Sequence, residues 1–251
     1  MREPEDPARA LLPWSLGRVL THALVVAAVF LLVSLVLDVA TSAVLMVADP
    51  AFDPQQPVVR VAPLGTRVWV ASMGTALACV PLVLFLVSRC ERAPLRFVFG
   101  APTTWRTLAV CGLVLLVFAL ASDLLTILID RPLVPPIIAE VHASAHPLPL
   151  FLALVVAAPL FEEVFFRGLV LGGLVSSGLS ARAAAVASAL AWSTLHLQYD
   201  LYGVATIFAM GLLLAWARLR TRSLLPCLLM HGLANLYAFV QLVWIAGRAG
   251  A

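Results

Sequence analysis

The sequence contains no lysine, few charged residues of either sign, and no cysteines spaced as CxxC. Only 12% of its 251 residues are charged, against about 25% in ordinary soluble domains. The arginines are spread along the chain without a clustered basic face, which argues against a nucleic-acid partner. The four scattered cysteines predict neither a disulfide framework nor a zinc site.

Apolar residues are what the sequence has in abundance. They make up 63% of the chain, the mean hydropathy is +1.04, and they gather in runs long enough to cross a bilayer as helices. This pattern predicts an all-α, polytopic transmembrane helical bundle of about seven spans. We expect these spans at residues 17–48, 68–88, 107–129, 148–177, 183–198, 203–217 and 223–246.

The distribution of polar, arginine and proline residues divides the chain into three regions. Residues 1–15 are polar and predict a tail, residues 16–147 predict N-terminal transmembrane helices and loops, and residues 148–246 hold the remaining helices. Two Pro-rich stretches, 49–67 and 130–149, are expected to be loops. Arginines precede the first span and follow the second and sixth, so the positive-inside rule predicts a cytoplasmic N-terminus in an integral membrane protein.

Six polar residues interrupt the apolar runs of three predicted spans. An ionisable side chain at mid-bilayer costs roughly 2.5–3.5 kcal/mol on insertion scales, so such residues are candidate functional residues. Glu163 and Arg167 are four residues apart and share a helix face, as do His231 and Asn235. Proline inside a helix bends it, so Pro159 could open a polar cavity beside the glutamates. The six residues are Glu162, Glu163, Arg167, His196, His231 and Asn235.

These residue types favour hydrolysis if they meet at one site. A carboxylate and an imidazole can bind and deprotonate a water molecule, and a second histidine with an asparagine can donate hydrogen bonds to an oxyanion. Alternatively, Glu162, His196 and His231 could bind a divalent metal such as zinc that activates the water. Taken alone, the Glu163–Arg167 pair could equally be a structural ion pair.

The residues match the motifs of a known family. The stretches "EEVFFRG" at 162–168, "WSTLH" at 192–196 and "HGLAN" at 231–235 resemble, in order and spacing, the three motifs of the CPBP superfamily. That superfamily comprises the type II CAAX prenyl proteases and bacteriocin-processing intramembrane endopeptidases, also called the Abi family. The resemblance covers residues 148–246, and residues 1–147 carry no recognisable signature.

The resemblance implies a helical membrane bundle with a cavity, in which a membrane-proximal peptide bond is cleaved. By motif position, Glu162 and His196 would activate the water, and His231 and Asn235 would stabilise the oxyanion. Glu163 and Arg167 would orient the site. The substrate would be a membrane-associated protein or peptide, lipidated or carrying a C-terminal sorting tail, and the location a bacterial inner (plasma) membrane. A metal requirement stays open.

Two other functions compete with an endopeptidase. A non-catalytic immunity or scaffold protein could keep the same motifs for helix packing. A proton-coupled transporter could use Glu, His and Arg as a relay, although no paired discontinuous segments support it. Outside the motifs, Asp38 and Asp123 lie within predicted spans, where helix-to-helix hydrogen bonding is at least as good an interpretation as a cavity lining.

Overall fold

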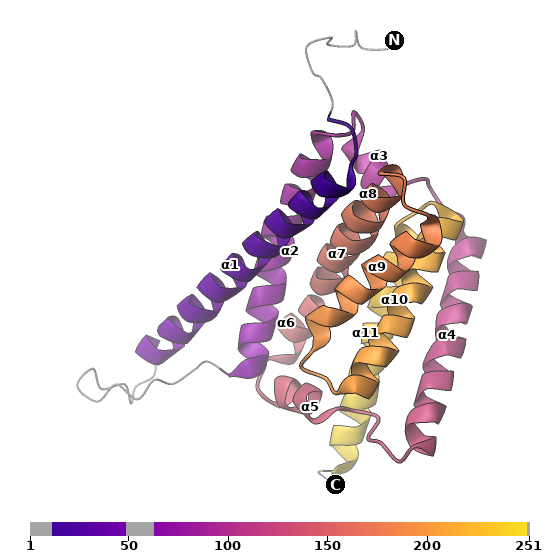
Figure 1. Ribbon diagram of the computed structural model, residues 1–251. Helices are drawn as coiled ribbons and strands as arrows, with labels where there is room; N and C mark the ends of the chain where they lie inside the picture. The colour runs from indigo at the N-terminus through magenta and orange to yellow at the C-terminus, as the bar shows by residue number, and fades with distance from the viewer. Residues whose placement is uncertain (1–11, 49–62, 250–251) are drawn as a thin grey trace.

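The computed structural model describes residues 12–48 and 63–249, and the regular structure in these ranges is helical apart from one isolated β-bridge between Gly100 and Ser223 (Figure 1). Most of the predicted tail 1–15 and of the predicted loop 49–67 lies outside the described residues. The elements are α1 (Leu16–Ala48), α2 (Leu64–Ser88), α3 (Pro94–Phe99), α4 (Trp105–Leu128), α5 (Pro136–Ala143), α6 (Pro147–Leu152), the π-helical η1 (Ala153–Ala157), α7 (Ala158–Glu163), the π-helical η2 (Val164–Val170), α8 (Leu171–Ser176), α9 (Ala181–Ser193), the 3₁₀-helical η3 (Thr194–His196), α10 (Leu201–Thr221) and α11 (Leu225–Ala249).

Six helical segments in the described ranges are long and apolar enough to cross a membrane, which confirms the predicted all-α membrane bundle. They are Leu16–Ala48, Leu64–Ser88, Trp105–Leu128, Pro147–Ser176, Leu201–Thr221 and Leu225–Trp244. The span expected at 183–198 is instead α9, which has 13 residues and reaches about 20 Å, short of the roughly 30 Å hydrocarbon core. It still runs back across the bundle between α8 and α10 (Figure 1).

Two of the expected loops contain short helices. The connection after α2 includes α3, and the Pro-rich stretch 130–149 includes α5, so the prediction of loop alone is wrong there. Each of these helices has proline in its first turn, where the missing N–H costs nothing because first-turn amides have no partner within the helix. Prolines that suggested a loop therefore mark helix starts.

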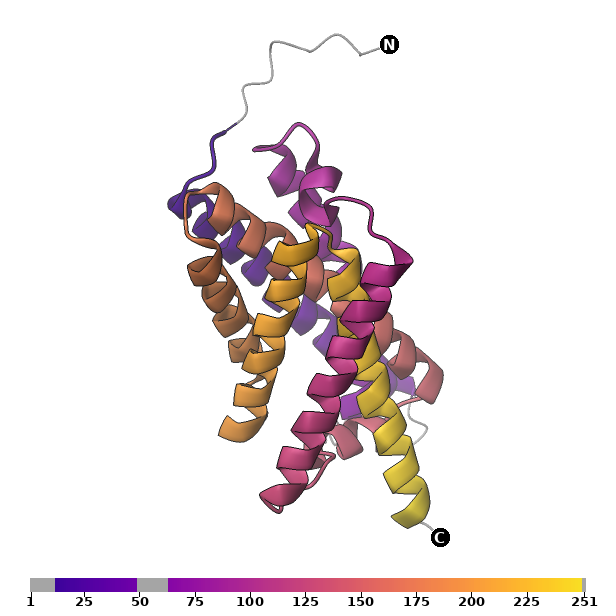
Figure 2. The ribbon, with the colours of Figure 1, turned by 90° about the vertical axis from the view of Figure 1, so that its right-hand side faces the viewer.

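The helices pack around the segment α6–α8. α1 pairs with α2 on one side, while α9, α10, α11 and α4 lie on the other, with α4 beside α11 (Figures 1 and 2). Arg67 donates to Asp38 and joins α2 to α1. Tyr237 and Gln241 of α11 donate to Asp123 of α4 at 2.5 and 2.6 Å. Both aspartates thus make helix-to-helix hydrogen bonds.

A close approach between α2 and α5 gives a stability prediction. A Cβ added at Gly65 would lie 2.0 Å from the carbonyl oxygen of Val141, a backbone atom that cannot rotate away. Gly65→Ala should lower the free energy of unfolding by about 1–3 kcal/mol, as overpacking does. Thermal unfolding in detergent measures this, and Gly112→Ala, where nothing lies within 4 Å, is the matched control. An unchanged midpoint for Gly65→Ala would contradict the close contact.

Candidate functional site

The motif "FEEVFFRG" lies where the central segment changes its helical winding. Glu162 and Glu163 end α7, and Arg167 lies in η2. Pro159 is in the first turn of α7, directly after η1. Proline cannot donate the α-helical hydrogen bond, and π turns occur frequently at functional sites. The bend expected at Pro159 is therefore accompanied by a π-helical stretch on each side of the glutamates.

Side chains from neighbouring helices bond to carbonyl groups of both π-helical stretches. The hydroxyl of Ser188, on α9, donates to the Phe166 carbonyl oxygen at 3.0 Å. The Asn235 amide, on α11, donates to the Leu154 carbonyl oxygen at 2.7 Å. Buried backbone carbonyls need such partners because no water replaces them in the lipid core. These two bonds fix the glutamate-bearing segment against α9 and α11.

Glu163 is the centre of a fully buried polar cluster. Its Oε1 accepts a hydrogen bond from Arg167 Nη1 at 2.8 Å and another from His231 Nδ1 at 2.8 Å. The side chains of Glu163 and Arg167 are both 0% exposed. Arg167 also donates to the Gly211 carbonyl oxygen at 3.2 Å, and its guanidinium lies 4.6 Å from the centroid of the Trp192 ring. The cluster thus joins η2 to α9, α10 and α11.

Glu162 lies near Trp192 and the other ring nitrogen of His231. Its Oε2 accepts a hydrogen bond from the indole N–H of Trp192 at 2.5 Å and lies 3.9 Å from His231 Nε2. Its side chain is 19% exposed, whereas that of Glu163 is 0% exposed. One glutamate is therefore enclosed by the arginine, while its neighbour remains partly accessible.

His196 reaches the site through Trp192. Its Nδ1 lies 3.1 Å from the Trp192 carbonyl oxygen, and because a carbonyl only accepts, Nδ1 carries the proton of that bond. Nε2 then presents a lone pair in the neutral ring. The Trp192 ring meets His196 and His231 edge-on, at centroid distances of 5.3 and 5.2 Å. Trp192 consequently contacts side chains from all three motifs.

Tyr199 packs beside His196 in the turn before α10. The two rings are stacked with centroids 6.3 Å apart. Burial, and to a smaller extent the charge of Glu162, raises the pKa of Tyr199 to about 12. Its hydroxyl therefore stays neutral near the carboxylate at physiological pH.

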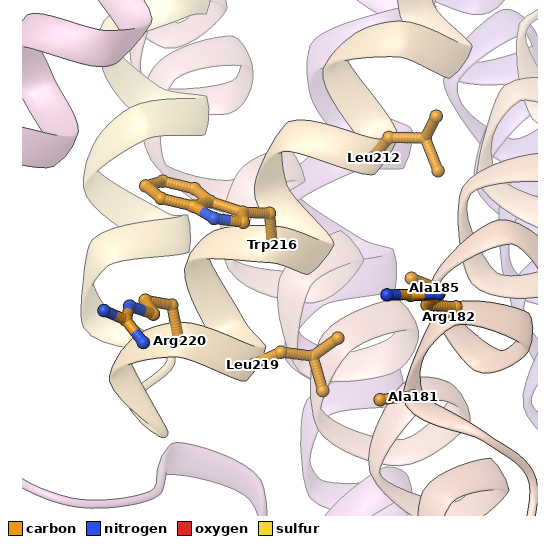
Figure 3. Close-up of a pocket in the computed structure, with 7 residues that line it drawn as sticks. All are labelled: Ala181, Arg182, Ala185, Leu212, Trp216, Leu219 and Arg220. Carbon is orange, nitrogen blue, oxygen red and sulfur yellow. The ribbon is translucent and has the colours of Figure 1, made fainter.

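The structure thus brings five of the six predicted residues into one connected set: Glu162, Glu163, Arg167, His196 and His231. Asn235 is one helical turn from His231, but the hydrogen bond recorded for it goes to the Leu154 backbone. Its role at an oxyanion stays a prediction. One cleft lies between α9 and α10, away from the motifs, and is lined by residues such as Arg182 and Leu212 (Figure 3). The polar cavity expected around the motifs stays a prediction.

A metal site is not formed by the described side chains. Among residues 12–48 and 63–249, no group of three or more His, Cys, Asp or Glu side chains is placed to hold a metal ion. Glu162 and His231 have ligand atoms 3.9 Å apart, and Nδ1 of His196 and of His231 is engaged elsewhere. Nε2 of each histidine is the nitrogen left for a metal, so a metal held by Glu162, His196 and His231 stays a prediction.

Several contacts at the site had no role in the sequence argument. Trp192 lies in the second motif, "WSTLH", but the motif alone does not indicate its bond to Glu162. The roles of Ser188, Gly211 and Tyr199 were missed. A tryptophan N–H inside an apolar helix needs a partner, which is a signal the sequence does carry. The carbonyl of Gly211 gives no such signal, because every residue has one.

Fold and site together define a helical integral membrane protein with a buried acid–histidine–arginine cluster between its helices. Residues 144–237 match the family model described as Rce1-like, type II CAAX prenyl endopeptidase Rce1-like. This match confirms the resemblance to the CPBP superfamily that the three motifs indicate, and the matched segment contains all six motif residues. Because that family is a protease family, the match supports a protease. Comparison with curated proteins and with solved structures gave no match.

Proposed function

We propose that this protein is an intramembrane endopeptidase that hydrolyses a membrane-proximal peptide bond of a membrane-associated or lipid-modified protein or peptide. The observation that carries the proposal is the set of contacts of Glu162. This one partly exposed carboxylate bonds to Trp192 of the second motif and lies 3.9 Å from His231 of the third. Side chains of the second and third motifs, from separate helices, therefore meet one carboxylate of the first motif.

Water activation would use Glu162 and His196. Glu162 would orient a water molecule, and the lone pair on His196 Nε2 would accept its proton as oxygen attacks the peptide carbonyl carbon. His196 would then give that proton to the leaving nitrogen, the C–N bond would break, and a carboxylic acid and an amine would leave. The hydrogen bond from His196 Nδ1 to the Trp192 carbonyl favours the required tautomer.

The oxyanion would face His231 and Asn235. Because His231 donates from Nδ1 to Glu163, donation from Nε2 requires a second proton on the ring. The carboxylates of Glu162 and Glu163 flank that ring and would balance its charge. Asn235 has a second amide hydrogen beyond the one given to Leu154. The Nε2–H of His231 and the amide N–H of Asn235 would be two hydrogen-bond donors that stabilise the oxyanion of the tetrahedral intermediate.

Glu163 and Arg167 would position the site without touching substrate. Both are fully buried and hold His231 and Trp192 through a hydrogen bond and a cation–π contact. Trp192 and His231 in turn contact Glu162. The pair would therefore act on catalysis through the orientation of these two rings.

The expected setting is a bacterial inner membrane with a cytoplasmic N-terminus. The family model is described by its action on CAAX prenyl substrates, so a protein with a lipid-modified C-terminus is one expected substrate. A peptide leader or a C-terminal sorting tail would offer a similar bond near the membrane. All three substrate types share a scissile bond close to the lipid surface.

A non-catalytic immunity or scaffold protein is the second candidate. It is favoured by the backbone bond of Asn235 and the complete burial of Glu163 and Arg167, since both also serve helix packing. The distinguishing experiment compares protein termini in cells that carry the wild type or Glu162→Ala. Termini next to membrane segments or lipidation sites should be present only with the wild type. Identical termini, together with an unchanged cellular phenotype, would favour the scaffold.

A further inference from the structure

The two ends of the helical bundle differ in charge. One end is formed by the start of α1, the connection from α2 to α4, the start of α9 and the end of α10 (Figure 1). We call it the arginine end, because its residues include Arg18, Arg92, Arg96, Arg106, Arg182 and Arg220. At the opposite end, Arg67 and Arg131 each pair with an aspartate, Arg248 is in the last turn of α11, and Asp130 and Glu140 are acidic. The positive-inside rule therefore predicts that the arginine end faces the cytoplasm.

A layer of buried residues lies between the candidate site and the arginine end. Residues 163–171, which follow Glu162 toward that end, are all buried. The buried residues of α10 all lie within 210–218, in the half of the helix nearer the arginine end. In α11, Met230 and His231 are buried as well. Packed side chains therefore separate the Glu162 carboxylate from the cytoplasmic surface.

The other side of the site is a short turn close to the opposite surface. η3 ends at His196, and residues 197–200 lead into α10. This turn stops short of the ends of α4 and α11 (Figure 2). Asp200 fixes its level, because it pairs with Arg131 just beyond the end of α4. These two side chains are 56% and 42% exposed, and exposed charges belong in water or among headgroups because they are costly in hydrocarbon. His196 thus lies near the extracytoplasmic surface.

Exposure falls stepwise from this turn to the catalytic carboxylate. Gln198 is exposed, whereas Tyr199 and His196 are half-buried and stacked on each other. Trp192 follows next to His196 and donates its indole hydrogen bond to Glu162. The Glu162 side chain is 19% exposed. A route lined by polar and aromatic side chains therefore leads from the α9–α10 turn to the site.

We propose that the site opens to the extracytoplasmic side of the membrane and cuts exported proteins at the extracytoplasmic end of a hydrophobic segment. This inference rests on the proposed protease function and narrows its substrates. A C-terminal sorting tail or a peptide leader presents its bond on that side once the rest of the protein has crossed the membrane. A lipid-modified tail at the cytoplasmic surface would have to part the buried layer to reach Glu162. The reaction that supplies the substrate is therefore export across the membrane.

Thiol labelling of intact spheroplasts tests the orientation without a need for activity. The native cysteines, Cys79, Cys90, Cys111 and Cys227, are buried and should react little with a membrane-impermeant maleimide. Gln198→Cys places a thiol in the turn, and Arg182→Cys, at the other end of α9, is the matched control; both positions are exposed. Intact spheroplasts should label Gln198→Cys at least about tenfold more than Arg182→Cys, because the maleimide reacts only with accessible thiolates. After lysis both should react.

His196→Cys tests the route into the site. Its thiol should also react in intact spheroplasts, since the position is half-buried and next to the exposed turn. Labelling of His196→Cys or Gln198→Cys only after lysis, or not at all, would overturn the proposal. Stronger labelling of Arg182→Cys in intact spheroplasts would overturn it as well.

The positions of the cleaved bonds test the substrate class. Termini present with the wild type and absent with Glu162→Ala should lie at the extracytoplasmic ends of hydrophobic segments. Wild-type-dependent termini on the cytoplasmic side would overturn this inference and leave the protease function standing. If no terminus depends on Glu162, the protease function and the substrate class both fail, while the labelling still reports which side the site faces.

Discussion

Glu162→Gln should lower the rate of substrate hydrolysis by about 10³-fold and leave the helical fold intact. Glutamine has nearly the same shape as glutamate and can still accept the indole hydrogen bond of Trp192. It lacks the negative charge that would orient and polarise the attacking water. The loss should therefore fall on kcat. Turnover of a substrate found by the comparison of termini, with purified protein in liposomes, measures the effect.

Glu140→Gln is the control for this prediction. Glu140 lies exposed on α5, so removal of its charge should leave turnover within about twofold, as surface changes away from a site usually do. Activity of Glu162→Gln above one tenth of the wild type would contradict the assigned role. The thermal unfolding midpoint must be recorded for both variants, so that lost activity is not mistaken for lost fold.

Arg167→Met should destabilise the protein by about 3–5 kcal/mol, the range found when one partner of a buried ion pair is removed. The guanidinium is fully buried, bonds to Glu163 and to the Gly211 carbonyl, and contacts the Trp192 ring. Methionine fills similar space but leaves the Glu163 carboxylate without its countercharge. Reversible unfolding in mixed micelles measures the difference.

Two further variants separate charge from packing at this position. Glu163→Gln/Arg167→Met removes both charges and should be more stable than Arg167→Met alone, because no buried carboxylate is left uncompensated. Arg106→Met, at an exposed position, should change stability by less than about 0.5 kcal/mol. A double variant that is less stable than Arg167→Met would show that the Glu163 charge is not the cause.

The sequence was sufficient for the helices that cross the bundle, because apolar runs determine membrane spans. The boundaries predicted for the span 17–48 differ by one residue or less from those of α1. The same is true of the predicted span 148–177 and the segment α6–α8. The span at 183–198 was the exception. Ser180 caps α9 at one end, and the chain leaves the α-helix at Ser193, so a run that looked membrane-spanning is 13 residues long.

The motif residues could also be identified from the sequence, but their contacts could not be predicted from it. The four-residue spacing of Glu163 and Arg167 predicted a shared helix face, and the structure has them 2.8 Å apart. The π-helical stretches accept hydrogen bonds from Ser188 and Asn235, which come from distant parts of the chain. The spacing of His231 and Asn235 likewise gave no sign that one bonds to Glu163 and the other to a backbone carbonyl.

The central claim is that Glu162 and His196 activate one water molecule together. A double-mutant cycle on kcat/KM with Glu162→Gln, His196→Ala and the combined variant tests it most directly. Residues that act as a unit are strongly non-additive, so the combined variant should lose about 10³-fold, no more than either single variant. A loss near 10⁶-fold, the product of two independent effects, would contradict a shared water and separate the two residues mechanistically.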